Sequence, residues 1–293
     1  RFLSKPEYRI QLDDLFTQET ERVIARISSA EFALPVQWDQ AVFRKHVRQY
    51  EAATEVLACM VGVLGRWGQD SELPLVSDVI RQLYAYAENR PSGLVVFLNI
   101  RSYPAVLVFT AYGLGLTRAE RWSTLHALFN TTIPGEYRTP VRVVETLFLQ
   151  RWKGAERDAW KQIEGLERLR APFSDHLLSL YSQWGNAFAR LTPDFELMFE
   201  RFELLGSLAY LEDDDKETIR KAVERDARDA YVSIPLVRIV WNRSNAEKLL
   251  TEIESAATKE SLIRAGFAKK DPEFLDLCIT NIKRIVGDRF YGR

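Results

Sequence analysis

Apolar residues recur at steps of three and four along most of this chain, the spacing that places them on one face of an α-helix. Pro, Gly and short polar runs separate these segments, and such residues end helices. The pattern therefore predicts an all-α protein, built as an irregular multi-helix array or bundle. The predicted helices span about residues 10–27, 39–66, 74–87, 104–116, 118–129, 141–152, 157–169, 174–191, 193–211, 218–230, 246–257, 260–267 and 272–286.

One segment departs from helical spacing. Residues Ala230 to Trp241, with the sequence AYVSIPLVRIVW, are rich in β-branched and aromatic side chains. Such residues favour extended structure, but Pro235 argues against a central strand because proline cannot donate a ladder hydrogen bond. We expect at most one short strand or an extended buried segment here.

The most apolar stretch, Leu94 to Leu116, is long enough to cross a membrane, but Asn99, Arg101 and Pro104 interrupt its centre. An arginine at the middle of a bilayer costs about 2.5–3.5 kcal/mol even on a lenient scale. We therefore predict a buried central helix with Pro104 near its first turn, and no membrane span.

The best candidate for a linker is Asn130 to Pro140, NTTIPGEYRTP, which gathers Pro, Gly and Thr between two periodic regions. It divides the chain into an N-terminal helical subdomain, 1–133, and a C-terminal one, 134–293. The alternative is one continuous domain.

Composition excludes several classes of protein. The 293 residues are 46% hydrophobic, and 40 basic residues balance 41 acidic ones. A disordered chain would be less hydrophobic, and a polycation that coats nucleic acid would carry an excess of basic residues. The two cysteines, Cys59 and Cys278, lie in apolar helical context, so we expect reduced thiols in a cytoplasmic protein. Because the chain begins at Arg1, we also expect it to be part of a longer protein.

Motifs for catalysis or cofactors are absent from the sequence. The three histidines are scattered, and there is no Cys-x-x-Cys pair, phosphate-binding loop or Gly-x-Ser-x-Gly elbow. The acidic run Leu211 to Glu217 lacks the alternating donors and central glycine of a calcium loop. We predict no catalytic residue, metal site or cofactor, and the balance leans against an enzyme.

Arginine outnumbers lysine by 29 to 11, and guanidinium groups suit bidentate contacts with phosphate or carboxylate. Our candidate ligand-binding residues are those that flank the central apolar stretch: Arg101, Tyr103, Arg118 and Arg121. The competing explanation is that these arginines form structural ion pairs.

Two segments resemble known patterns. Asn99 to Phe129 resembles an Arg-x-Tyr-Pro-Ala motif followed by an apolar helix and Arg-Trp/Tyr-x-x-Leu, and Asp194 to Glu212 resembles a motif around Phe-x-Arg-Phe-Glu. Tyr50 to Leu57 fits as well. Together they resemble the helical C-terminal region of multidomain bacterial, defence-associated proteins that have sirtuin-like or Schlafen-like N-terminal modules. The resemblance brings no catalytic residues with it.

The leading hypothesis is a non-catalytic helical sensor, regulatory or oligomerisation region of a larger intracellular bacterial protein in antiviral defence. Its partner would be an effector domain of the same polypeptide, another protein or a second copy of the chain. An exposed aromatic or apolar patch would favour this hypothesis. The first alternative is a nucleotide- or nucleic-acid-binding helical domain that uses arginine contacts, which a basic groove would favour. The second is an all-helical enzyme without a sequence motif, which a deep pocket with shifted pKa values would favour.

Overall fold

A computed structural model describes residues 8–89, 92–135, 139–185, 194–224 and 232–291. Across these residues the chain is all-α apart from one small hairpin, as predicted. The α-helices are α1 (Arg9–Ile27), α2 (Gln40–Trp67), α3 (Leu73–Glu88), α4 (Val95–Asn99), α5 (Tyr103–Arg118), α6 (Trp122–Phe129), α7 (Val143–Thr146), α8 (Arg157–Trp160), α9 (Pro172–Trp184), α10 (Phe195–Leu211), α11 (Lys216–Glu224), α12 (Arg243–Glu254), α13 (Ala256–Ala265) and α14 (Pro272–Tyr291). Short 3-10 turns are η2 (Ala30–Phe32), η3 (Asp70–Glu72), η4 (Ile100–Ser102), η6 (Leu149–Arg151) and η7 (Phe267–Lys270).

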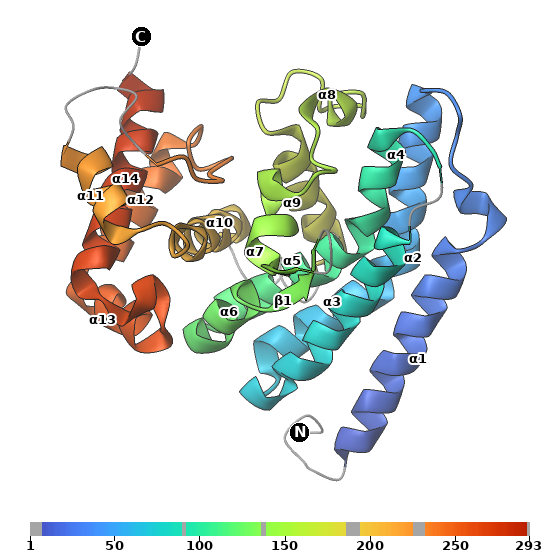
Figure 1. Cartoon of the computed structure of the whole chain (residues 1–293), viewed down its shortest axis with the longest axis horizontal. Coiled ribbons are helices and arrows are strands. Elements are labelled where there is room, and N and C mark those ends of the chain that lie inside the picture. Colours follow the sequence, from blue (N-terminus) through green and yellow to red (C-terminus); the bar gives the residue numbers. More distant parts are fainter. Residues whose placement is uncertain (1–7, 90–91, 136–138, 186–193, 225–231, 292–293) are drawn as a thin grey trace.

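Helix α5 is the central element of the fold. Figure 1 shows it between α1–α4 on one side and α10–α14 on the other. Every residue from Tyr103 to Thr117 is buried, and Pro104 lies in the first turn, where the missing N–H is tolerated. The helical stretch Val95–Arg118 is long and apolar enough to cross a membrane, but 72% of its most apolar part is buried in the protein. Its hydropathy is therefore that of a core helix.

Helices α2 and α5 approach each other closely through glycine. A Cβ atom on Gly115 would lie 2.4 Å from the carbonyl oxygen of Gly62, and one on Gly65 would lie 2.6 Å from the carbonyl oxygen of Tyr112. Contacts this short are not possible for real Cβ atoms. The two backbones therefore pack at a distance that only glycine allows.

The only strands among the described residues lie at the predicted linker, which contains β1 and ends at the first residue of β2. Strand β1 (Thr132–Pro134) pairs antiparallel with β2 (Pro140–Arg142), and Ile133 lies opposite Val141. The buried hydrophobic side chains on both sides of this hairpin belong to one contiguous cluster, which reaches from Phe16 to Val286.

The helix predictions are correct for most of the chain but wrong for much of 141–169. That region contains the last two residues of β2, the short helices α7 and α8, the turn η6 and irregular backbone. Its apolar residues include Trp152 and Trp160, which are buried in a cluster with Phe173 and not along a helix face. Three ends of predicted helices, at Leu191, Pro193 and Ala230, lie outside the described residues.

Residues Val232–Trp241, which we call the strap, have irregular backbone as far as Val237 and then turn, and this described segment forms no helix or strand. The described part of the predicted range holds no strand, and its burial is partial: Leu236, Val237, Ile239 and Val240 are buried, whereas Ser233 and Trp241 are exposed. Ala230 and Tyr231 lie outside the described ranges. The side-chain amide of Asn281 donates to the Val232 carbonyl oxygen at 2.9 Å, and its oxygen accepts the Val232 N–H at 3.0 Å. Helix α14 thus holds the start of the strap.

Candidate functional site

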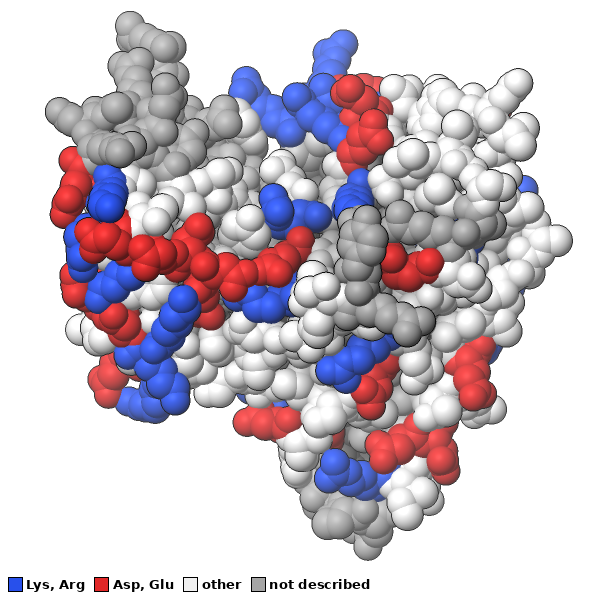
Figure 2. Space-filling view, in the orientation of Figure 1, with Lys and Arg blue, Asp and Glu red and all other residues white. Residues whose placement is uncertain are grey.

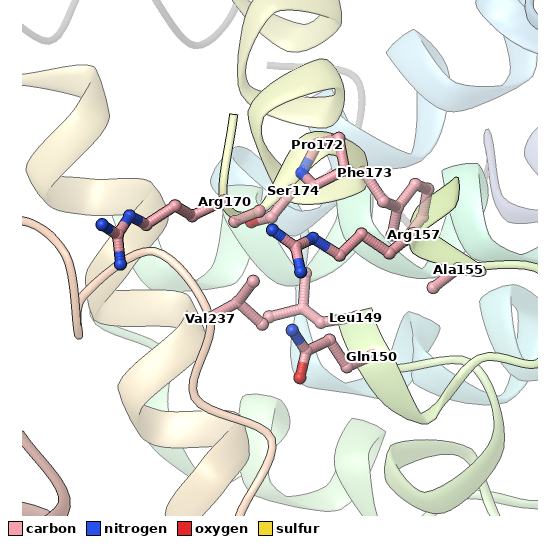
Figure 3. Close-up of a pocket in the computed structure, with 10 residues that line it drawn as sticks. Leu149, Gln150, Ala155, Arg157, Arg170, Pro172, Phe173, Ser174 and Val237 are labelled. Atoms are coloured by element: carbon pink, nitrogen blue, oxygen red, sulfur yellow. The ribbon is translucent and has the colours of Figure 1, made fainter. Parts of the chain in front are cut away.

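The start of helix α9 forms one wall of a small pocket (Figure 3). Ser174 comes from the first turn of α9, Arg170 from the loop before it, and Arg157 from the start of α8. Gln150 of η6 and Val237 of the strap complete the polar and apolar lining. The interior volume is about 30 Å³, within a hollow of about 300 Å³ that includes the open mouth.

Helix α9 begins without a side-chain cap. Pro172 occupies the first position, which suits its fixed φ and missing N–H. The N-cap residue, Ala171, has no side-chain oxygen to accept the N–H groups of Phe173 and Ser174. Such first-turn N–H groups have no partner inside a helix, and the helix dipole adds positive potential there. This end of α9 therefore favours an anion.

Ser174 is the one pocket residue whose polar group is fully buried and unpaired. Its side chain is 1% exposed, and its Oγ atom forms no hydrogen bond with the described residues. A buried hydroxyl without a partner destabilises a fold by about 1–3 kcal/mol. A ligand oxygen in the pocket would remove this penalty.

The two arginines are not neutralised by ion pairs in the described parts of the chain. In Figure 3 Arg157 extends across the pocket, with its guanidinium between Ser174 and Gln150. Arg170 turns away from the centre, and its Cζ atom lies 4.3 Å from the ring centroid of Trp241. The pocket thus has one central positive charge and a second at its rim.

Next to the pocket, Arg238 of the strap meets several carboxylates. It forms ion pairs with Asp175 of α9 and Glu196 of α10, and its Nε atom lies 3.6 Å from Glu200. The side chain of Arg238 is only 14% exposed. This cluster joins the strap to α9 and α10.

Glu200 and Glu203 lie one turn apart on α10, and both are 0% exposed. The carboxyl oxygens of Glu203 accept the backbone N–H groups of Val237 and Arg238. Burial raises the pKa of Glu200 to about 7 and that of Glu203 to about 8. A pair of carboxyls with raised pKa values can serve acid–base catalysis. Here, however, the strap covers them, so their geometry suits a structural role.

A second buried polar group joins α2, α5 and α9. His176 Nε2 lies 2.5 Å from Glu51 Oε1, and the hydroxyl of Tyr103 donates to the same oxygen at 3.0 Å. The ring of His176 also contacts that of Trp160, with centroids 5.1 Å apart. Aromatic packing surrounds this pair, and no cysteine or serine nucleophile pairs with His176 in the described part of the chain.

The structure separates the residues that the sequence suggested as a site. Arg101 and Tyr103 lie at the start of α5, whereas Arg118 and Arg121 lie at its end. At about 1.5 Å per residue, the 16 residues of α5 span about 24 Å. One phosphate group cannot contact both ends.

Each of these residues is buried or partly buried at or next to an end of α5. Arg101 is 8% exposed and donates to the carbonyl oxygens of Tyr86 and Asn89 at the end of α3, at 3.1 and 3.2 Å. Tyr103 is completely buried. Arg118 is partly buried at the end of α5.

Arg121 forms an ion pair with Asp70 at 2.7 Å. Hydrogen bonds from Thr124 and Arg121 lower the pKa of Asp70. Arg121 also donates to two carbonyl oxygens at the end of α2, those of Leu64 and Gly65. It thus connects the end of α2 to the loop between α5 and α6.

Sequence reasoning missed Ser174, Arg157 and Arg170. The predicted helix began at residue 174, so Pro172 was placed outside it, although proline at a first helical position is a recognised start signal. Placing the helix start at Pro172 would have put Ser174 in the first turn and Arg170 next to it. No sequence pattern indicated that Val237 lines the pocket, because Val237 lies more than sixty residues after Ser174 in the chain.

The tryptophans divide between core and surface. Trp152 and Trp160 are buried and Trp184 is partly buried, whereas Trp38, Trp67 and Trp241 are exposed, at 47%, 50% and 39%. Val36 and Val95 are exposed as well, at 91% and 69%. Trp38 packs on the buried ring of Phe97 in α4, with ring centroids 5.9 Å apart.

Charges of both signs are interleaved on the face shown in Figure 2, most clearly over α11–α14 at the left. That face shows no broad basic groove in its described parts. Among the described residues, no three His, Cys, Asp or Glu side chains gather as a metal site. Cys59 is partly buried and Cys278 is buried, and both are free thiols.

Comparison with protein-family models, with curated proteins and with solved structures finds no match to this chain. The functional argument therefore depends on the pocket at the start of α9 and the strap beside it.

Proposed function

We propose that this chain is a non-catalytic helical sensor or regulatory region of a larger intracellular bacterial protein that acts in antiviral defence. The observation that carries the proposal is that one residue belongs both to the pocket and to the strap. Val237 lines the pocket, and its backbone N–H is bound by the buried Glu203. A ligand in the pocket would therefore stabilise the strap and the C-terminal helices attached to it.

The connection from pocket to C-terminal helices is continuous. Arg238, next to Val237, contacts α9 and α10 through its ion pairs. At the other end of the strap, Val232 is fixed to Asn281 of α14. Coupling between distant parts of a protein needs such a physical connection, and this one supports a regulatory role.

The two segments that carry the family resemblance also support this proposal. They form α5 with α6, and α10, and the rings of Phe109 and Phe202 from the two segments lie 5.9 Å apart. A shared sequence pattern in two packed segments favours a common helical core in these proteins.

Val36, Trp38 and Val95 are exposed apolar side chains available to the partner, which would be an effector domain of the same polypeptide, another protein or a second copy. Exposed apolar side chains favour protein contacts where they form a patch. The mixed charge in Figure 2 gives less support to nucleic-acid binding, which uses a basic surface.

Native mass spectrometry of the protein as purified from its host would test this proposal, followed by hydrogen exchange with any retained ligand present and removed. We expect a small retained ligand that slows exchange in the strap and in α14 and that is recovered chemically unchanged. Conversion of the ligand to a product would instead identify an enzyme. Co-purified RNA that is lost at high salt would favour the nucleic-acid alternative.

A further inference from the structure

We propose that the pocket at the start of α9 binds the phosphate group of a small molecule, through Arg157, the Ser174 hydroxyl and the first-turn N–H groups of α9. This inference names the ligand class of the proposed sensor, and its regulatory meaning rests on that proposed function. The binding itself rests on the pocket alone.

The donors of the pocket are all of the kind that an oxyanion needs. Arg157 presents a guanidinium fork, Gln150 an amide and Ser174 a hydroxyl. Helix α9 adds the first-turn N–H groups, which have no partner within the helix and no side-chain cap. A guanidinium fork binds two oxygens of one phosphate, and helix N-termini bind anions through N–H groups and the dipole. A carboxylate has only two oxygens, whereas a tetrahedral phosphate can accept from donors on several sides.

The buried hydroxyl of Ser174 is the second, independent sign of a ligand. It is 1% exposed, lines the pocket and has no partner among the described residues. Buried polar groups in native proteins nearly always have a hydrogen-bond partner. A phosphate oxygen at this place would accept from the hydroxyl.

The size of the pocket limits how much of the ligand it can hold. Each water molecule needs about 10–15 Å³ of such interior volume, so about 30 Å³ holds about two waters. This interior space admits about two oxygens of a phosphate and excludes a ring, so the remaining phosphate oxygens would lie in the open part of the hollow. The rest of the ligand would lie at the mouth, where Arg170 supplies a second positive charge against Trp241.

The acidic cluster next to the pocket does not face it with free charge. Asp175 and Glu196 are paired with Arg238, and Glu203 accepts two backbone N–H groups. Arg157 and Arg170 are left for the ligand.

Calorimetric titration of the whole chain with inorganic phosphate and with pyrophosphate, at constant ionic strength, tests the site. We expect both to bind, and pyrophosphate to bind more tightly because Arg170 can contact its second phosphate. Arg157→Ala should weaken binding by roughly tenfold, as loss of a charge-assisted contact does. Arg168→Ala is the matched control: Arg168 is exposed, lies in the loop before α9 that also carries Arg170, and does not line the pocket.

Ser174→Ala tests the site by two measurements, phosphate affinity and thermal stability, which should change in opposite directions. It should weaken phosphate binding about threefold, but raise the midpoint of thermal unfolding in phosphate-free buffer, because a buried unpaired hydroxyl is removed. A serine with a purely structural role would instead lose stability. An unchanged phosphate affinity in this variant would overturn the proposed site.

The site would also be overturned if phosphate and pyrophosphate did not bind at millimolar concentration. Equal weakening of phosphate binding in Arg157→Ala and Arg168→Ala would overturn it too. These results leave the sensor proposal intact if a host ligand still slows exchange in the strap. Conversely, site-specific phosphate binding without any change in strap exchange would contradict the sensor and support the site. Tighter binding of adenosine triphosphate than of pyrophosphate would assign the phosphate to a nucleotide, and equal affinity to a simple phosphate ester.

Discussion

At the scale of single residues, buried ionisable side chains of this protein bind backbone groups of neighbouring segments. Glu203 holds the strap by two backbone N–H groups. Arg101 binds carbonyl oxygens at the end of α3. Both side chains serve backbone groups that would otherwise lack partners, and buried unpaired backbone groups are costly.

Glu203 should make stability depend on pH. Its pKa rises from 4.5 in the unfolded chain to about 8 in the folded one, because burial disfavours the charge. The folded protein therefore keeps a proton that the unfolded chain releases, and the free energy of unfolding falls as pH rises from about 5 to 8. The contribution is at most about 1.4 kcal/mol per pH unit.

Urea unfolding across this pH range measures the effect. Glu203→Gln stays neutral at every pH, so its unfolding free energy should depend less on pH than that of the native protein. Glu260→Gln serves as the control, because the side chain of Glu260 is 72% exposed. A slope that is unchanged in Glu203→Gln would refute the assignment.

Arg101→Ala should destabilise the protein by about 1–3 kcal/mol, because the carbonyl oxygens of Tyr86 and Asn89 lose their donor in a buried place. Arg48→Ala, at an exposed position of α2, should change stability by less than about 0.5 kcal/mol. Chemical unfolding of the two variants is the measurement. Equal free energies of unfolding for the two variants would show that Arg101 does not stabilise the end of α3.

At the scale of elements, the long periodic helices could be predicted from sequence, and the segment 141–169 could not. Its apolar spacing imitates a helix, but Trp152 and Trp160 are placed by ring contacts with Tyr103 and Phe173. Such packing is a property of the assembled core, which local spacing does not contain. For the same reason the pocket was missed, since its walls come from η6, α8, α9 and the strap.

The contact between α2 and α5 offers a test at this scale. Gly115→Ala would place a Cβ atom 2.4 Å from the Gly62 carbonyl oxygen, so the helices must separate. We expect a loss of about 1–3 kcal/mol. Gly287→Ala in α14 is the matched control, because a Cβ there meets nothing within 4 Å, and helical alanine should add about 0.5–1 kcal/mol. Thermal unfolding distinguishes them, and a neutral Gly115→Ala would contradict the close approach.

At the scale of the whole molecule, one hydrophobic cluster runs through the chain, and the strap connects its central and C-terminal helices. Figure 1 places α11–α14 at one end and α1 at the other. The prediction of two subdomains at residue 133 stays open to experiment, since the cluster spans the boundary while the hairpin marks it.

Asn281→Ala should loosen the strap. Its amide makes both hydrogen bonds to Val232 in a fully buried position, so the variant should lose roughly 2–3 kcal/mol. Hydrogen exchange should rise in residues 232–240 and in α14, while α1 stays unchanged. Thr280→Ala, at the neighbouring exposed position, should leave exchange in the strap as it is. A uniform rise across all helices would argue against a local role.

The strap also has a consequence for synthesis of the protein. Arg157, Arg170 and Ser174 leave the ribosome well before Val237, and the residue that fixes the strap, Asn281, follows later still. A nascent or truncated chain would therefore carry the groups that we propose to bind an anion, without Val237 to complete the pocket. Ligand capture would then report that the polypeptide has been made through α14, and an interrupted product would remain unresponsive.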